Sequence, residues 1–332
     1  MPHERLVAVS YPVDGEMTRV NTDVLRADAT VAFLQQRGED ERREILRRAE
    51  ALIGWNLREE LPDGAWQDVP GLRFVQLLSA GADAVDFAAL PDRLVLASNV
   101  GAYAEPIAEH VMAMTLALAR RLPQRQAGLA RGEFNQSEPL LTLNGAVCAI
   151  LGFGGIGTAT ARLMRAFGAR IHAVNSSGRT SEPVESAGML ADLDRVLAAA
   201  DVVVIALPLT TVTRGLIGAR ELGLMKRTAI LVNVSRAAIV DEGALYRHLR
   251  DHPQFCAGID AWWHEPGGWK EPGGGFFTGY PFFDLPNLIG SPHNSGLVPG
   301  VLPAAARLAA ENVGRFLHGD ALTGVVRRAD YL

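Results

Sequence analysis

Residues 146–180 read AVCAILGFGGIGTATARLMRAFGARIHAVNSSGRT, and this stretch decides the fold. An apolar run typical of a buried strand leads into a Gly-x-Gly-x-x-Gly sequence, and a helical pattern follows. In that context the first glycine makes a tight turn, the second lets the backbone approach a pyrophosphate, and the third lets the helix pack closely on the strand. Glycines also mark ordinary turns, but this placement favours a dinucleotide site, with the diphosphate on the helix N-terminus. We therefore expect NAD or NADP to bind at Gly152, Gly154, Gly155, Ile156 and Gly157.

Length and composition restrict the class of protein. The chain has 332 residues, of which 21% are charged and 48% hydrophobic, values typical of a soluble globular protein with room for two domains. A formal net charge of -5 offers no broad basic surface, so we expect no nucleic-acid partner. The polar N-terminus lacks a signal-peptide pattern, and no apolar run has membrane-spanning length. We expect a cytoplasmic protein that does not enter a membrane.

The two cysteines carry no sign of chemistry. Cys148 and Cys256 both lie in apolar, strand-like runs, and neither has a metal-ligand spacing. We expect two buried thiols and no metal site.

The rest of the chain alternates short apolar runs with helical stretches, the pattern of parallel sheets covered by helices. The expected strands, besides the run before the glycines, are 6–10, 51–55, 74–78, 94–97, 170–174, 201–207, 229–235, 255–261 and 288–291. Helices are expected at 39–50, 104–122, 190–200, 242–251 and 304–317, and we interpret 104–122 as one long helix. The sequence thus predicts an α/β fold with a Rossmann-type doubly wound parallel sheet.

Three polar residues follow expected strands, at the edge where open parallel sheets bind their ligands. Each has an ordinary interpretation: Arg236 as a solvated arginine, Glu265 as a loop carboxylate, and His293 as a loop histidine with satisfied hydrogen bonds. Together they supply what hydride transfer to a 2-oxo acid requires. An arginine binds the substrate carboxylate and polarises its carbonyl, a histidine supplies the proton, and a carboxylate orients the histidine.

Six stretches, in order along the chain, resemble the signature of the D-isomer-specific 2-hydroxyacid dehydrogenase family, in particular its glyoxylate and hydroxypyruvate reductases. They are 78–83 (LSAGAD), 152–157 (GFGGIG), 207–210 (LPLT), 233–236 (NVSR), 260–266 (DAWWHEP) and 291–294 (SPHN). The stretches cover nearly the whole chain, and the ordered set is specific.

The resemblance implies interconversion of a small 2-oxo acid and a D-2-hydroxy acid. Arg236 would be the substrate-binding arginine, His293 the general acid/base and Glu265 its partner. The resemblance further implies a substrate-carboxylate site at Ser79, Ala80 and Gly81, and cofactor contacts at Leu207, Pro208, Val234 and Asp260. Asp260 would contact the nicotinamide carboxamide.

The resemblance also implies the domain organisation. A Rossmann cofactor domain, 100–294, would lie between two hinges. A smaller, flavodoxin-like α/β substrate domain would combine 1–99 with 295–332, and a homodimer is expected.

The residue after the second cofactor strand bears on the choice between NAD and NADP. An acid near this position binds the ribose 2′-hydroxyl of NAD and repels a 2′-phosphate. Here Asn175 is uncharged, and Ser176, Ser177 and Arg179 follow, offering hydroxyl donors and one cation. A solvated polar turn with NAD bound through neutral hydrogen bonds is the alternative. We expect NADP to be favoured over NAD.

Two other departures from the family pattern stand out. Ala237 occupies a position that is commonly glycine, which matters only if its φ is positive. An aromatic, glycine-rich segment, 262–286, replaces a shorter polar connection and puts the substrate identity in doubt. This segment is either a loop anchored to its own domain, or a wall of the active site or a dimer contact.

The sequence leaves some other functions open and excludes others. Phosphite and formate dehydrogenases belong to the same family, and Glu265 argues against formate because formate dehydrogenases typically have glutamine there. A nucleotide-sensing co-repressor is the alternative from another class, although a pure sensor needs no proton donor. His264-Glu265 could begin a zinc-protease motif, but position 268, where the second histidine would lie, is glycine, so this class is excluded. The sequence has no Gly-x-Ser-x-Gly elbow, so nothing in it indicates a serine hydrolase.

Overall fold

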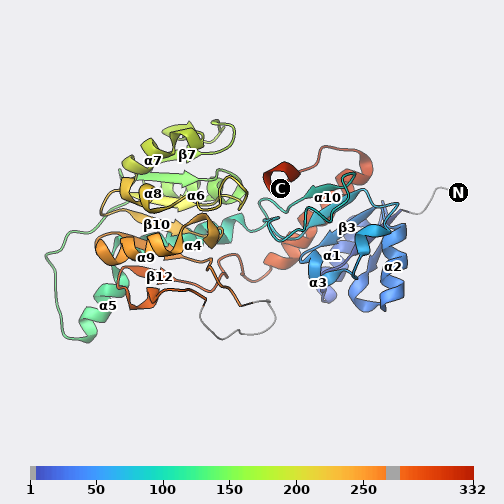
Figure 1. Cartoon of the computed structure of the whole chain (residues 1–332), viewed down its shortest axis with the longest axis horizontal. Coiled ribbons are helices and arrows are strands. Elements are labelled where there is room, and N and C mark those ends of the chain that lie inside the picture. Colours follow the sequence, from blue (N-terminus) through green and yellow to red (C-terminus); the bar gives the residue numbers. More distant parts are fainter. Residues whose placement is uncertain (1–4, 267–276) are drawn as a thin grey trace. The chain divides into compact units, whose positions relative to one another are not determined.

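The computed structural model describes residues 5–266 and 277–332 and divides into two compact units. The first unit combines Met1–Tyr103 with Leu297–Leu332, and the second is Ala104–Gly296 (Figure 1). Within the described ranges, no helix is both long and apolar enough to cross a membrane.

The first unit is a five-stranded parallel sheet in the order β2-β1-β3-β4-β5. This is the flavodoxin-like doubly wound order, which confirms the predicted fold class. Helices α1 and α10 pack together on one face, where alanines of α10 allow close approach. The strands are β1 (Leu6–Val9), β2 (Thr30–Phe33), β3 (Ala51–Gly54), β4 (Phe74–Leu77) and β5 (Val95–Ala97). The helices are α1 (Gly15–Leu25), α2 (Glu39–Arg48), α3 (Leu57–Glu60) and α10 (Val301–His318).

The second unit is a seven-stranded parallel sheet in the order β12-β11-β10-β9-β6-β7-β8. Counted within the unit this is the Rossmann order with one additional strand at the end, as the glycine turn predicts. The strands are β6 (Val147–Leu151), β7 (Arg170–Val174), β8 (Ser186–Gly188), β9 (Val202–Ile205), β10 (Ile230–Asn233), β11 (Cys256–Ile259) and β12 (Leu288–Gly290). The helices are α4 (Ala104–Ala119), α5 (Leu122–Ala130), α6 (Gly155–Ala166), α7 (Leu193–Ala199), α8 (Ala219–Leu224) and α9 (Glu242–Asp251).

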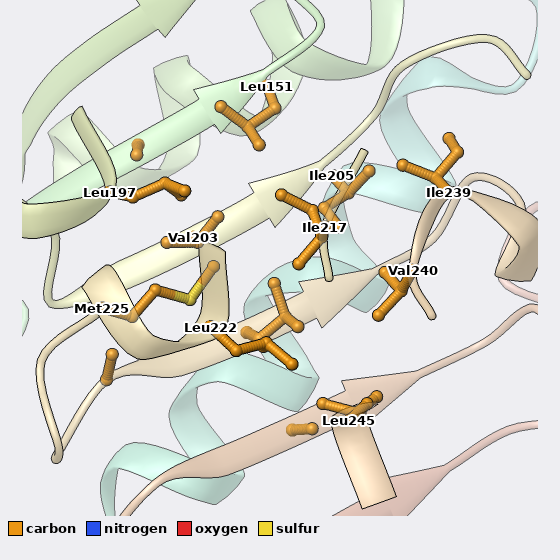
Figure 2. Close-up of a cluster of buried hydrophobic side chains, with 14 of the residues drawn as sticks. Leu151, Leu197, Val203, Ile205, Ile217, Leu222, Met225, Ile239, Val240 and Leu245 are labelled. Carbon is orange, nitrogen blue, oxygen red and sulfur yellow. The ribbon is translucent and has the colours of Figure 1, made fainter. Parts of the chain in front are cut away.

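Both faces of this sheet are covered, which explains why its strands are continuously apolar. Successive side chains of a strand point to opposite faces, so Val203 and Ile205 enter one core and Val202 and Val204 the other. Figure 2 shows the first core, where Leu197, Leu222 and Leu245 from α7, α8 and α9 meet the strands. Cys148 and Cys256 are free thiols buried in the second core. Burial raises the pKa of Cys148 to about 12, so this thiol is not a nucleophile at neutral pH.

Two local expectations need correction. The helix expected over 104–122 ends at Ala119, because Arg121 adopts a left-handed φ of 50° and a second helix, α5, starts at Leu122. Strands β2 and β8 were not expected from the sequence. β2 is only partly buried and β8 is three residues long, so neither produces a clear apolar run.

Candidate active site

The glycine turn joins β6 to α6 at the point where the strand order reverses, between β6 and β9. Gly152 has a φ of 94°, and a Cβ there would overlap the carbonyl oxygen of Ala206, just after β9. A Cβ on Gly157 would overlap the carbonyl oxygen of Gly152. These two glycines are therefore required by backbone conformation and packing, independently of any ligand.

Gly154 is different, and its surroundings fit a diphosphate. A Cβ on this residue would meet no atom within 4 Å, so glycine leaves open space rather than filling a tight contact. Gly154 is the N-cap of α6, which has no side-chain cap, and the first N–H groups of a helix lack intrahelical partners. Open space beside uncapped backbone donors is the arrangement that binds the phosphates of a dinucleotide.

We expect Gly157→Ala to lower the free energy of unfolding by about 1–3 kcal/mol, because the new methyl group must push α6 away from the turn. Gly223→Ala is the matched control: this glycine also lies in a helix, α8, but has nothing within 4 Å of its added Cβ. The control should be neutral or slightly stabilising. Urea titration of both variants measures the difference, and equal stabilities would contradict the packing role.

The turn after β7 is organised by Asn175. Its Oδ1 accepts hydrogen bonds from the N–H groups of Ser177 and Gly178 and from the Ser177 hydroxyl, while its Nδ2 donates to the carbonyl of Arg179. The amide therefore shapes the turn from within. The side chains of Ser176, Ser177 and Arg179 are exposed around it.

Arg236, Glu265 and His293 follow three adjacent strands, β10, β11 and β12. Adjacent strands lie about 4.8 Å apart, so the topology brings the three side chains to one edge of the sheet. The turn that carries Arg236 is shaped by buried Asn233, whose Nδ2 donates to the Arg236 carbonyl. Oδ1 of Asn233 accepts from the N–H and hydroxyl of Ser235.

Glu265 and His293 form a direct hydrogen bond. Nδ1 of His293 lies 2.8 Å from Oε2 of Glu265, and Oε1 of Glu265 accepts from the N–H of Trp262 at 2.8 Å. Burial raises the pKa of Glu265, but hydrogen bonds from His293 and Trp262, with the charges of His293 and Arg236, outweigh it and hold this pKa below its usual range. Glu265 is therefore ionised at neutral pH, which leaves Nε2 of His293 to exchange a proton.

His293 has an unusual backbone. Its φ is 52°, in the left-handed region that few residues other than glycine adopt. The flanking residues are firmly held: the indole Nε1 of Trp262 donates to the carbonyl of Ser291, two residues before His293. A conformation of this kind persists where its surroundings fix it.

Asp260 is fully buried after β11, and its carboxylate accepts three hydrogen bonds. Oδ1 accepts from the hydroxyl of Ser291 at 2.6 Å and the N–H of Asn294 at 3.2 Å. Oδ2 accepts from the N–H of Ser295 at 3.3 Å. Every one of these donors belongs to the loop that carries His293.

The remaining predicted residues lie just after the carboxyl ends of strands in their own units. Leu207 is buried two residues after β9, Val234 is buried directly after β10, and the carbonyl of Pro208 accepts from the Thr213 hydroxyl. In the first unit, residues 79–81 follow β4 and form a loop braced by the Ser79 hydroxyl, which donates to the Gly81 carbonyl.

The two sequence departures have structural accounts. Ala237 begins a short 3₁₀ turn, Ala237–Ile239, and the non-glycine residues with positive φ in the described chain are Arg121 and His293. The Ala237 position therefore needs no glycine. Of the aromatic segment 262–286, residues 267–276 lie outside the described residues. Its flanks are anchored to their own unit: Trp263 stacks on Phe282, and Glu242 accepts from the Thr278 hydroxyl.

The supporting roles of Asn233, Trp262 and Ser291 do not follow from the sequence. All three lie within the six motif stretches, but nothing in the sequence shows which atoms they contact. Among the residues that the structure places, no group of three or more His, Cys, Asp or Glu side chains is suited to hold a metal ion.

A doubly wound sheet with an uncapped glycine turn at its switch point defines a dinucleotide-binding α/β protein. Residues 112–295 match the family model for the NAD binding domain of D-isomer specific 2-hydroxyacid dehydrogenases. The chain therefore belongs to the D-isomer specific 2-hydroxyacid dehydrogenase family and is an oxidoreductase with an NAD(P)-binding domain.

Individual relatives agree with this assignment. The chain is 31% identical to a glyoxylate reductase of Thermococcus gammatolerans over 90% of both chains. It is also 31% identical to a glycerate dehydrogenase of Methylorubrum extorquens, over 76% of this chain and 78% of the relative. A crystal structure of a D-isomer specific 2-hydroxyacid dehydrogenase family protein from Aeromonas salmonicida matches with a TM-score of 0.75 and 26% identity, covering 98% of this chain and 99% of the other.

Proposed function

We propose that the protein reduces a small 2-oxo acid to a D-2-hydroxy acid, reversibly, with NADPH as the preferred hydride donor. The observation that carries the proposal is the hydrogen bond between Nδ1 of His293 and ionised Glu265, beside the strand end that carries Arg236. The relatives named glyoxylate reductase and glycerate dehydrogenase support glyoxylate and hydroxypyruvate as the first substrates to test.

Each residue has a defined task in this proposal. NADPH, when bound at the N-terminus of α6, would supply the hydride that the reduction requires. Arg236 holds the substrate carboxylate and polarises the carbonyl, because its planar fork can engage both groups. His293, as imidazolium, gives its Nε2 proton to the carbonyl oxygen, and Glu265 stabilises the imidazolium through Nδ1. In the reverse direction neutral His293 takes the hydroxyl proton.

Binding of the substrate carboxylate by the backbone N–H groups around Ala80 and Gly81, next to Ser79, stays a prediction. The carboxamide contact expected of Asp260 stays a prediction, and so does a homodimer. For the cofactor, the uncapped N-terminus of α6 supports a diphosphate site at Gly154 and Gly155.

A substrate panel tests the proposal. We would follow the nicotinamide absorbance with NADPH and NADH against glyoxylate, hydroxypyruvate and pyruvate, and with both oxidised cofactors against formate and phosphite. Turnover of 2-oxo acids at ordinary enzyme rates is expected. Turnover with phosphite or formate alone would replace the proposed reaction by the alternative one, and cofactor binding without any turnover would indicate a sensor.

We expect the preference for NADPH to depend on the turn after β7. Asn175→Asp keeps an acceptor for the N–H groups of Ser177 and Gly178 and loses the donor to the Arg179 carbonyl. It also adds a charge that repels a 2′-phosphate, so it should weaken NADPH far more than NADH. Arg179→Ala should also weaken NADPH selectively. Arg170→Ala is the matched control, because this exposed arginine lies at the opposite end of β7. Dissociation constants from nicotinamide fluorescence measure the effect, and equal losses for both cofactors would contradict the assignment.

A further inference from the structure

A chain of hydrogen bonds connects α4 to the loop that carries His293. Nε2 of His110 lies 2.8 Å from the hydroxyl oxygen of Ser291, and this hydroxyl lies 2.6 Å from Oδ1 of Asp260. His110 and Ser291 are 181 residues apart in the sequence, and the direct distance from Nε2 of His110 to Oδ1 of Asp260 is 4.0 Å. None of the tasks assigned above uses His110.

The packing of α4 on the sheet places this histidine. Gly258 in β11 has no side chain where Met114 of α4 crosses it, and a Cβ there would lie only 3.0 Å from the Met114 sulfur. Met114 is four residues after His110, so both side chains lie on the same face of the helix. The close approach at Gly258 therefore brings His110 to the strand end occupied by Asp260.

The direction of the hydrogen bonds follows from the donors available. Ser291 has a single hydroxyl proton and donates it to Oδ1 of Asp260. The Ser291 oxygen must then accept from His110, which requires a proton on Nε2 of the imidazole. His110 thus fixes the orientation of the Ser291 hydroxyl, and the hydroxyl helps to fix the buried carboxylate.

Asp260 in turn holds the backbone on both sides of His293. It accepts from Ser291, two residues before His293, and from the N–H groups of Asn294 and Ser295, the two residues after it. The residue between these attachments is the one with a φ of 52°. A carboxylate with a fixed orientation is thus the element that can maintain this left-handed backbone and the direction of the imidazole.

We propose that His110 is a positioning residue for the acid/base His293, acting through Ser291 and Asp260 on the loop between them. This inference rests on the proposed function of His293. If Asp260 acted only by contacting the nicotinamide, loss of His110 would change cofactor affinity. The positioning role predicts instead a change in the proton-transfer step and in the loop, with cofactor affinity unchanged.

Two variants separate the donor from the shape of the side chain. His110→Leu removes the donor, and His110→Gln retains an N–H group at a similar distance along the side chain. His110→Leu should lower kcat by about 10-fold, the typical effect of losing one hydrogen bond in a charged network, and His110→Gln should restore most of it. Dissociation constants for NADPH and for ADP-ribose, which lacks nicotinamide, should stay unchanged. Glu109→Gln, on the exposed face of α4, is the control for helix effects.

A second measurement reads the loop without turnover. Amide hydrogen exchange at Asn294 and Ser295 should accelerate about 10-fold in His110→Leu and in Ser291→Ala, relative to amides in β6. The double variant should be no worse than either single variant, because both remove the same chain of bonds. If the wild-type protein turned over no 2-oxo acid, the proposed function would be wrong. The exchange measurement would still test whether His110 holds the loop that carries His293.

Three results would overturn the inference. Unchanged amide exchange at Asn294 and Ser295 in His110→Leu would show that the histidine does not hold the loop. Weakened binding of NADPH with unchanged binding of ADP-ribose would show that the network acts on the nicotinamide instead. A loss in His110→Gln as large as that in His110→Leu would show that the donor is not what matters.

Discussion

Arg236→Lys is expected to lower kcat/KM for a 2-oxo acid by at least about 100-fold, a loss comparable with removing one donor that stabilises a developing oxyanion. Lysine keeps the positive charge but has no planar fork, so it cannot engage the substrate carboxylate and carbonyl together. The buried amide of Asn233 holds the carbonyl of residue 236 in either variant, so the backbone of the turn should be retained.

Steady-state kinetics with a 2-oxo acid and saturating cofactor measure this effect, and cofactor affinity should change little. Arg250→Lys is the matched control, because Arg250 is an exposed arginine paired with Asp251 at the end of α9. Near wild-type kinetics for Arg236→Lys would show that Arg236 does not bind the substrate through its planar fork.

Glu265→Gln is expected to move the pH profiles in both directions of the reaction toward lower pH. The pKa of Glu265 is held below its usual range, so its carboxylate is charged wherever histidines titrate and favours the imidazolium form of His293. A neutral amide would not attract a protonated ring in this way. The alkaline limb of reduction, where activity depends on the protonated ring, should therefore move to lower pH. The rising limb of oxidation, which needs neutral histidine, should shift the same way.

The maximal rate should also fall, by about 10- to 100-fold. Trp262 and His293 use different oxygens of the Glu265 carboxylate, and in glutamine one of these two positions is an NH2 group that cannot accept. Asp28→Asn is a matched control: Asp28 forms a carboxylate–histidine pair of similar length with His318 in the first unit. Its removal should leave both profiles in place. If the Glu265→Gln profiles coincide with those of the wild type in both directions, the Glu265–His293 pair is not coupled to proton transfer.

Much of the fold follows from local pattern. The strand–glycine–helix unit around Gly152 is readable because apolar periodicity and backbone requirements coincide in one continuous stretch. The edge strands β2 and β8 are not readable in this way, since they are stabilised by pairing with β1 and β7 rather than by an apolar run of their own. The break at Arg121 depends on a left-handed residue that is not a glycine, which no simple pattern predicts.

For the site, too, some features can be predicted from local pattern and others cannot. Arg236, Glu265 and His293 could be proposed as a set because parallel strands end at one edge, so three positions after strands become neighbours. The hydrogen bonds that hold these residues join positions far apart in the chain, such as Trp262 to Ser291 and His110 to Ser291. Those contacts depend on how α4 and the loops pack, and they became visible only in three dimensions.

The order of strands in the second unit also bears on how this protein could be re-engineered. Asn175 follows β7 and Arg236 follows β10, three strand spacings away, a separation of about 14 Å. Substitutions so far apart, without shared partners, usually have additive effects. Changes to the turn after β7, where we propose that the adenosine end binds, should therefore combine freely with changes around Arg236. Selection could therefore change the preference between NADH and NADPH without changing the reaction at the substrate. A designer could likewise change cofactor preference and substrate binding in two independent steps.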